Sequence, residues 1–177
     1  MEDLAMYLLD IANNAIRAMA SLIEIVLINS EKRDLLLLSV KDNGEGMDDQ
    51  MVEKVQDPFF TTRTTRKVGL GIPLFKQGAL MANGSFKLES APHQGTLIEA
   101  SYQRSHLDTP PLGDIAESLV TIIQAGEAQT IRFHYEDDAR VFDLDTDQVK
   151  EILEGVSILT PEVLLWLKTY IKEGIGQ

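Results

Sequence analysis

Residues 42–71 read DNGEGMDDQMVEKVQDPFFTTRTTRKVGLG and combine three features in one run. The run opens on an acidic turn with two glycines, Gly44 and Gly46, which permit positive φ and let a ligand approach the backbone closely. A polar loop with three cations follows, and Gly69-Leu70-Gly71 then leads into a helical pattern. This order predicts a nucleotide pocket with a flexible lid, and the rest of the chain is expected to build its walls.

The second half of this run predicts donors for a polyanion. Residues 61–67 hold four Thr, two Arg and one Lys, with little periodicity. Gly69 and Gly71 precede a helix with Pro73 in its first turn, where proline is tolerated. Free N–H groups at such a helix start, with no Cβ in the way, suit a phosphate. A solvated charged loop is the alternative interpretation of the cations taken alone.

Composition excludes several classes of protein. The 177 residues contain no Cys, which rules out disulfides and thiolate metal sites. A formal net charge of −12 argues against nucleic-acid or anionic-membrane binding. No apolar run reaches the length of a membrane span, and the N-terminus is acidic rather than signal-like. We expect a cytoplasmic protein without nucleic-acid or membrane partners.

Upstream of the run, the sequence predicts a helix and two strands. Residues 3–19 carry one apolar stripe at helical period, flanked by Asp10 and Asn14, which are four residues apart and so share a face. Residues 23–28 and 35–41 predict an antiparallel strand pair. Asp42 follows the second strand, where its carboxylate could accept a hydrogen bond from an exocyclic amine such as adenine N6.

Downstream elements complete a two-layer α+β unit, with a mixed, mainly antiparallel sheet and helices on one face. Phe59 and Phe60 are expected to fill the core beneath the loop. The remaining elements of this part are predicted at 48–56 (helix), 71–82 (helix), 85–90 (strand) and 96–102 (strand).

Residues 108–113 (DTPPLG) predict a boundary, because two Pro and a Gly separate periodic segments. We therefore divide the chain into a nucleotide-binding domain, 1–106, and a small α+β appendage, 107–177. The appendage contains 14 acids and 5 bases and shows no chemical motif. Its apolar helix faces suggest a protein partner or a homodimer, and Trp166 is interpreted as core or interface.

The combined motifs of residues 1–104 resemble the GHKL ATPases, which include gyrase B, heat-shock protein 90, histidine kinases and MutL. The order matches: a helix with Asp10 and Asn14, the Asp42 turn, residues 57–63 (DPFFTTR) beside a lid, a Gly-Leu-Gly helix start, and Gly95-Thr96 before a strand. No Walker A or dinucleotide fingerprint competes with it. The resemblance implies the Bergerat ATP-binding fold.

The resemblance also implies roles for individual residues. Asp10 matches the position that orients or deprotonates the attacking nucleophile, although the family's Glu reaches about one methylene further. Asn14 matches the ligand of ATP-bound Mg²⁺, and Asp42 matches the adenine-binding aspartate. The other implied ATP-binding positions are Gly44, Gly46, Met47, Phe60, Thr62, Arg63, Thr64, Thr65, Arg66, Lys67, Val68, Gly69, Leu70, Gly71 and Thr96.

Three functions are open at this point. The first is Mg²⁺-dependent ATP binding with slow hydrolysis or phosphoryl transfer to a protein Ser or Thr, as in the anti-sigma-factor branch. The second is a non-catalytic, ATP-sensing adaptor. The third is a histidine-kinase-like ATP domain acting in trans, because the chain starts at the Asp10 helix and leaves no room for a phosphoacceptor hairpin. Its three His are expected at the surface.

Overall fold

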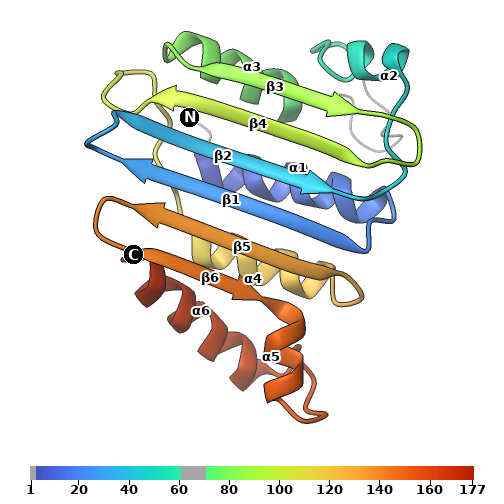
Figure 1. Cartoon of the computed structure of the whole chain (residues 1–177), viewed down its shortest axis with the longest axis vertical. Helices are drawn as coiled ribbons and strands as arrows, with labels where there is room; N and C mark the ends of the chain where they lie inside the picture. The colour runs from blue at the N-terminus through green and yellow to red at the C-terminus, as the bar shows by residue number, and fades with distance from the viewer. Residues whose placement is uncertain (1–2, 61–70) are drawn as a thin grey trace.

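The computed structural model describes residues 3–60 and 71–177. Figure 1 shows one twisted sheet with helices behind it. Nine of the predicted ATP-binding positions lie outside the described residues: Thr62, Arg63, Thr64, Thr65, Arg66, Lys67, Val68, Gly69 and Leu70.

The sheet contains six strands in the order β3-β4-β2-β1-β5-β6. Four neighbouring pairs are antiparallel, and β1 and β5 are parallel. The strands are β1 (Leu22–Ser30), β2 (Leu35–Asp42), β3 (Ser85–Ser90), β4 (Thr96–Gln103), β5 (Thr130–Asp137) and β6 (Val141–Asp145). The predicted mixed, mainly antiparallel sheet is therefore confirmed.

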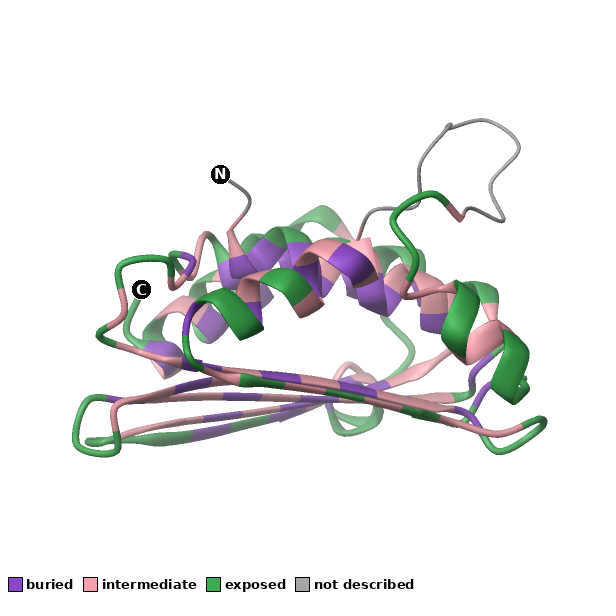
Figure 2. Cartoon of the chain, turned by 90° about the horizontal axis from the view of Figure 1, so that it is seen from above, coloured by how far each residue is buried: buried purple, intermediate pink, exposed green. Residues whose placement is uncertain are grey.

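The helices lie on one face of the sheet, and the other face is bare over the described residues (Figure 2). They are α1 (Leu4–Arg17), α2 (Asp49–Lys54), α3 (Gly71–Met81), α4 (Ile115–Ala125), α5 (Thr146–Ile152) and α6 (Pro161–Ile175). This arrangement is the two-layer α/β sandwich that the sequence predicted.

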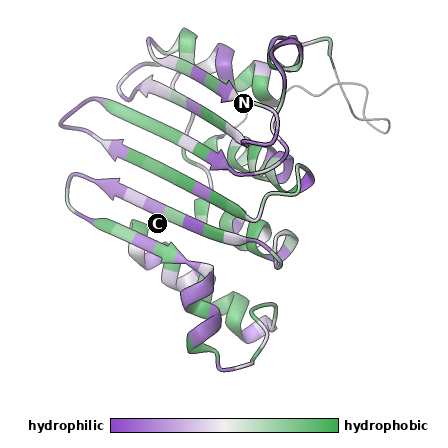
Figure 3. Ribbon diagram, turned by 45° about the vertical axis from the view of Figure 1, so that its right-hand side comes forward, coloured by the Kyte–Doolittle hydropathy of each residue, from purple (hydrophilic) through white to green (hydrophobic). Residues whose placement is uncertain are grey.

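Strand periodicity decides which face the helices cover. Alternate residues of β2, namely Leu36, Leu38 and Val40, are buried, as are alternate residues of β1. In α1 the buried residues recur at helical spacing and include Leu4, Leu8 and Ile11. Figure 3 shows that β1 and β2 are mostly hydrophobic along their length, whereas β5 changes between hydrophobic and hydrophilic residues. The core therefore lies between this sheet face and the helices.

Residues 107–177 continue this sheet rather than forming a separate one. β5 runs beside β1, with Phe133 opposite Ile25, and the buried side chains of both segments belong to one core cluster. The connecting segment also closes the start of α1, because the Leu4 N–H donates to the Pro111 carbonyl at 2.9 Å. The predicted boundary falls within the connection from β4 to α4; the independence of residues 107–177 as a functional domain stays a prediction.

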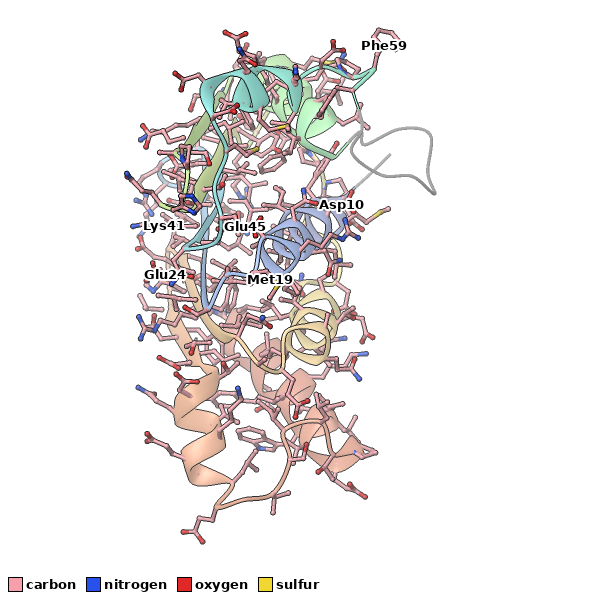
Figure 4. All side chains as sticks on the ribbon, turned by 90° about the vertical axis from the view of Figure 1, so that its right-hand side faces the viewer. Asp10, Met19, Glu24, Lys41, Glu45 and Phe59 are labelled. Carbon is pink, nitrogen blue, oxygen red and sulfur yellow. The ribbon has the colours of Figure 1, made fainter. Side chains whose placement is uncertain are left out.

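One core prediction is wrong: Phe59 does not fill the core, since 93% of its surface is exposed (Figure 4). An Asx turn after α2 explains this, because the Phe59 N–H donates to Asp57 Oδ1 at 2.9 Å and directs the chain outward. Phe60 is only half-buried. The core beneath α3 is filled instead by Phe75, whose ring packs against those of Tyr7, Phe86 and Tyr102.

Candidate functional site

Asp42 ends β2 on the helix-covered side of the sheet, two residues after buried Val40. Its Oδ1 accepts a hydrogen bond from the Gly44 N–H at 2.8 Å, and the backbone N–H of Thr96 also donates to its carboxylate. Burial raises the pKa of Asp42 above its ordinary value, and the two N–H donors oppose this shift. The carboxylate is thus fixed in position and partly removed from water, as an adenine contact requires.

The turn after Asp42 is fastened to the chain segment that follows α1. The Glu45 N–H donates to the Ala18 carbonyl at 2.8 Å. Asn43 accepts hydrogen bonds from the backbone N–H groups of Ser21 and Leu22, both at 2.9 Å. A Cβ on Gly44 would lie 2.6 Å from the Ala18 carbonyl oxygen. Gly44 therefore serves close packing between the turn and α1, while Asn43 has a structural role.

Sequence reasoning missed Ser90, at the end of β3. Its hydroxyl accepts from the Met47 N–H at 2.8 Å, contacts the Gly95 carbonyl at 2.9 Å, and lies 2.8 Å from Thr96 Oγ1. Ser90 therefore ties together Met47 and Thr96, two predicted ATP-binding positions. A serine at a strand end is common, so no local pattern marked it.

Thr96 contacts Asp42 through its main chain. Its backbone N–H donates to the Asp42 carboxylate, while its hydroxyl pairs with Ser90. The two residues face each other in the antiparallel register of β2 and β4. Assistance by the Thr96 side chain to an adenine contact stays a prediction.

The predicted catalytic residue and the predicted phosphate-binding helix start lie side by side. Asp10 lies midway along α1, and Gly71 is the first residue of α3. A Cβ built on Gly71 would lie 3.0 Å from Oδ2 of Asp10. Figure 4 shows Asp10 on α1, with Glu45 on the turn that follows β2. Two residues 61 positions apart are thus brought together by the packing of α1 and α3.

Asn14 lies one helical turn after Asp10 on α1 and is half-buried. The described residues contain no cluster of three or more His, Asp or Glu suited to a metal ion. A single amide ligand fits Mg²⁺, which keeps several waters and binds substrate phosphates rather than requiring a cage of protein ligands. The donor set around Asn14 is therefore compatible with Mg²⁺ bound through ATP.

A cavity of about 340 Å³ at this end of the sheet only partly overlaps the predicted pocket. Its walls include Asp42, Ser90 and Thr96, and also Lys41 and Glu89, which belong to the bare face. Neither Asp10 nor Asn14 lines it. The candidate site therefore rests on the hydrogen-bonded groups above rather than on this cavity, because no residue of α1 lines the cavity.

The sequence profile described as "Histidine kinase-, DNA gyrase B-, and HSP90-like ATPase" matches residues 2–106. The chain belongs to this family. The match begins before α1 and ends just after β4, so it contains every described residue of the candidate site. Membership in this family of ATPases implies that the chain binds ATP.

Two curated members of the family resemble parts of the chain. Sensor protein kinase FleS of Pseudomonas aeruginosa is 38% identical over 88 residues, which are 50% of this chain and 22% of that protein. Sensor histidine kinase YvrG of Bacillus subtilis is 27% identical over 99 residues, or 54% of this chain and 17% of that protein. The chain thus matches about a fifth of the length of these relatives.

Solved structures of the family share the fold. The Aquifex aeolicus MutL ATPase domain complexed with ADP has a TM-score of 0.54 at 17% identity, covering 87% of this chain and 70% of that one. The N-terminal domain of a DNA repair protein has a TM-score of 0.53 at 16% identity, covering 82% and 52%. Such coverage exceeds what residues 2–106 can supply, so the shared fold includes part of 107–177.

The length and the apolar character of a helix decide whether it can cross a membrane. Among the described residues, no helix combines the length and the apolar character needed to cross a bilayer.

Proposed function

We propose that this family member binds Mg²⁺·ATP and either hydrolyses it slowly or transfers its terminal phosphoryl group to a Ser or Thr of a protein partner. The observation that carries the proposal is the proximity of Asp10 to Gly71. Oδ2 of Asp10 lies 3.0 Å from the position that a Cβ atom on Gly71 would occupy. A helix N-terminus binds phosphate, and a carboxylate beside it can act on the group that attacks the phosphorus.

Three described residues would position the substrate. Asp42 would accept a hydrogen bond from the adenine amine, since its carboxylate is partly desolvated and directed by two backbone donors. Asn14 would hold Mg²⁺, and the α3 start at Gly71 would hold phosphate oxygens. The roles proposed for residues 62–70 in contacting the phosphates rest on the family resemblance.

Asp10 would take a proton from a water molecule or from the partner's hydroxyl as that oxygen attacks. Mg²⁺·ATP supplies the transferable phosphoryl group and the charge neutralisation that makes it reactive. The Asp10 side chain is anchored on a helix whose opposite face is core, so its reach is set by the distance between α1 and α3.

The relatives favour a second candidate function. FleS and YvrG are named as sensor kinases, which supports a histidine-kinase-like ATP domain that acts in trans on a separate His-containing protein. An acid-labile phosphoprotein formed with Mg²⁺·ATP would identify this function. A cytoplasmic location, a partner bound through residues 107–177 and a homodimer are further parts of the proposal.

The test is phosphate release by the purified chain with Mg²⁺·ATP, alone and with cell extract. Asp10→Asn should abolish phosphate release and phosphoryl transfer while ATP binding persists, and Asp10→Glu should retain turnover as the charge-conserving control. Binding of ATP without any hydrolysis or phosphoryl transfer would contradict the enzymatic functions and would favour the non-catalytic, ATP-sensing adaptor. Full ATP affinity in Asp42→Ala would refute the pocket itself.

A further inference from the structure

Helix α6 carries a second apolar stripe that the core does not use. Its buried side consists of Leu167, Ile171 and Ile175. On its outer side Leu165 and Trp166 remain 67% and 50% exposed. Single exposed apolar residues are ordinary, whereas grouped ones indicate a binding surface. The outer side of α6 therefore requires an explanation beyond folding.

The aromatic residues of this stripe are held rigidly. The rings of Trp166 and Tyr170 stack, with centroids 5.1 Å apart and an interplanar angle of 10°. Tyr170 in turn packs edge-on against Phe142 of β6 at 5.2 Å. A preorganised Trp–Tyr pair loses little conformational entropy on binding, and both residues are enriched in interface hot spots.

Apolar side chains are also exposed in the segment that leads into α6. Ile152, at the end of α5, is 78% exposed, and Val156 is 53% exposed. In Figure 3, the ribbon of this part of the chain changes between hydrophilic and hydrophobic residues. We call the outer side of α6, comprising Leu165, Trp166 and Tyr170 with flanking Glu162 and Glu173, the α6 stripe.

Glutamates on α6 and in the segment before it carry unpaired negative charge. The carboxylates of Glu162 and Glu173 on α6, and of Glu151 and Glu154 before it, have no hydrogen bond or ion pair with any residue that the structure describes. All five cations of residues 107–177 are engaged elsewhere: Arg132 with Asp145, Arg140 with Asp137, Lys150 with the Glu127 carbonyl, Lys168 with Glu117, and Lys172 with Asp114.

We propose that the α6 stripe docks a basic amphipathic helix of a partner protein. The apolar face of such a helix would cover Leu165, Trp166 and Tyr170, while its Lys or Arg residues would pair with the flanking carboxylates. A second copy of this chain fits poorly, because two α6 stripes in contact would bring the same unpaired carboxylates together. Charge complementarity thus selects a basic occupant.

This inference gives a location and a chemistry to the partner contact proposed above for residues 107–177. It does not involve the Asp10, Asn14 and Asp42 site, so the two proposals can fail separately.

Trp166 is the only tryptophan in the chain, so its fluorescence reports on the α6 stripe directly. The probe is a Trp-free helical peptide of about 14 residues with Leu at helical spacing and Lys elsewhere. We expect it to shift the Trp166 emission to shorter wavelength and to bind at least tenfold more tightly than the same peptide with Glu in place of Lys. No shift, or equal binding of the Glu peptide, would overturn the proposal.

Two exposed glutamates in the last turns of their helices give a matched pair of variants. Glu173→Lys alters the α6 stripe, and Glu53→Lys makes the same change of net charge on α2. The Lys peptide should bind the Glu173→Lys variant at least threefold more weakly than the wild type, and its affinity for the Glu53→Lys variant should be unchanged. An equal loss of affinity in both variants would indicate general attraction to an acidic protein and would refute the site. Concentration-dependent dimerisation that is abolished by Trp166→Ala would also refute the proposal, because the α6 stripe would then bind a second copy of this chain. ATP affinity, measured on the same samples, should be unchanged in both variants.

Discussion

Oδ2 of Asp10 lies 3.0 Å from the point that a Cβ atom on Gly71 would occupy. This contact links the middle of α1 to the first residue of α3, and a Cβ there would press on the Asp10 carboxylate, which would have to move by a few tenths of an ångström. Gly71 therefore allows the close approach of Asp10 to the start of α3.

Gly71→Ala should displace the Asp10 side chain and lower phosphate release at least tenfold, because a misplaced base loses its alignment with the attacking oxygen. The matched control is Gly78→Ala in the same helix, where a Cβ would meet only Tyr102 at an ordinary 3.8 Å. That control should keep full turnover and gain up to about 1 kcal/mol in the free energy of unfolding. Unchanged turnover in Gly71→Ala would show that the position of the Asp10 carboxylate beside Gly71 does not control phosphate release.

Asp42→Asn should change ligand binding and stability in opposite directions. ATP affinity should fall at least tenfold, because a carboxylate acceptor for the adenine amine is lost. The midpoint of thermal unfolding at pH 7 should rise, because burial of the Asp42 charge, which raises its pKa, no longer opposes folding. Calorimetric titration and thermal melts of the same preparation test both effects; a parallel loss of both would indicate a merely structural aspartate.

The pH dependence of this effect has a definite sign. Since the pKa of Asp42 is higher in the folded chain than its ordinary value of 3.8, the folded state holds the proton more tightly. The free energy of unfolding of the wild type, relative to Asp42→Asn, should therefore fall as pH rises from 3.8 through the raised pKa, and then level off. Urea titrations of both proteins across this range check it; a difference independent of pH would contradict the burial of the charge.

Gly95→Ala should lower the free energy of unfolding by about 3 kcal/mol or more, because φ is +80° and a Cβ would lie 1.9 Å from the Asp42 carbonyl oxygen. Gly155 has a comparable φ of +93°, but no atom lies within 4 Å of its Cβ position. Gly155→Ala should therefore cost only about 1 kcal/mol from backbone strain. Equal costs in urea denaturation would show that the backbone around Asp42 adapts easily.

Tyr102→Phe should stabilise the chain by about 1 kcal/mol, because the buried Tyr102 hydroxyl has no hydrogen-bond partner among the described residues. Burial, and then the neighbouring Tyr7, raise the pKa of this hydroxyl above its usual range. Tyr135→Phe is the converse control: its hydroxyl donates to Asp137 at 3.0 Å, so removal should cost about 1 kcal/mol. Destabilisation by Tyr102→Phe would reveal a hidden partner such as a buried water.

Local patterns predicted the secondary structure closely, because period and turn chemistry act over a few residues. The strand expected at 35–41 is observed at Leu35–Asp42, and the helix expected at 71–82 is observed at Gly71–Met81. The prediction that Phe59 fills the core was wrong because hydrophobicity does not reveal the direction of a side chain after an Asx turn. Ser90 was missed because its contact with the Met47 N–H joins segments 43 residues apart, and a serine at a strand end is common.

The sequence by itself determined the elements, the order of the motifs and the family, since these depend on residue type and spacing along the chain. Tertiary structure alone decided that the Asp10 carboxylate meets Gly71 and that β5 pairs with β1 in parallel, which places residues 107–177 in the same sheet as the site. Such long-range pairings arise when whole elements bury their apolar faces against one another. A local periodicity specifies which face is buried, but it does not specify the partner that covers it.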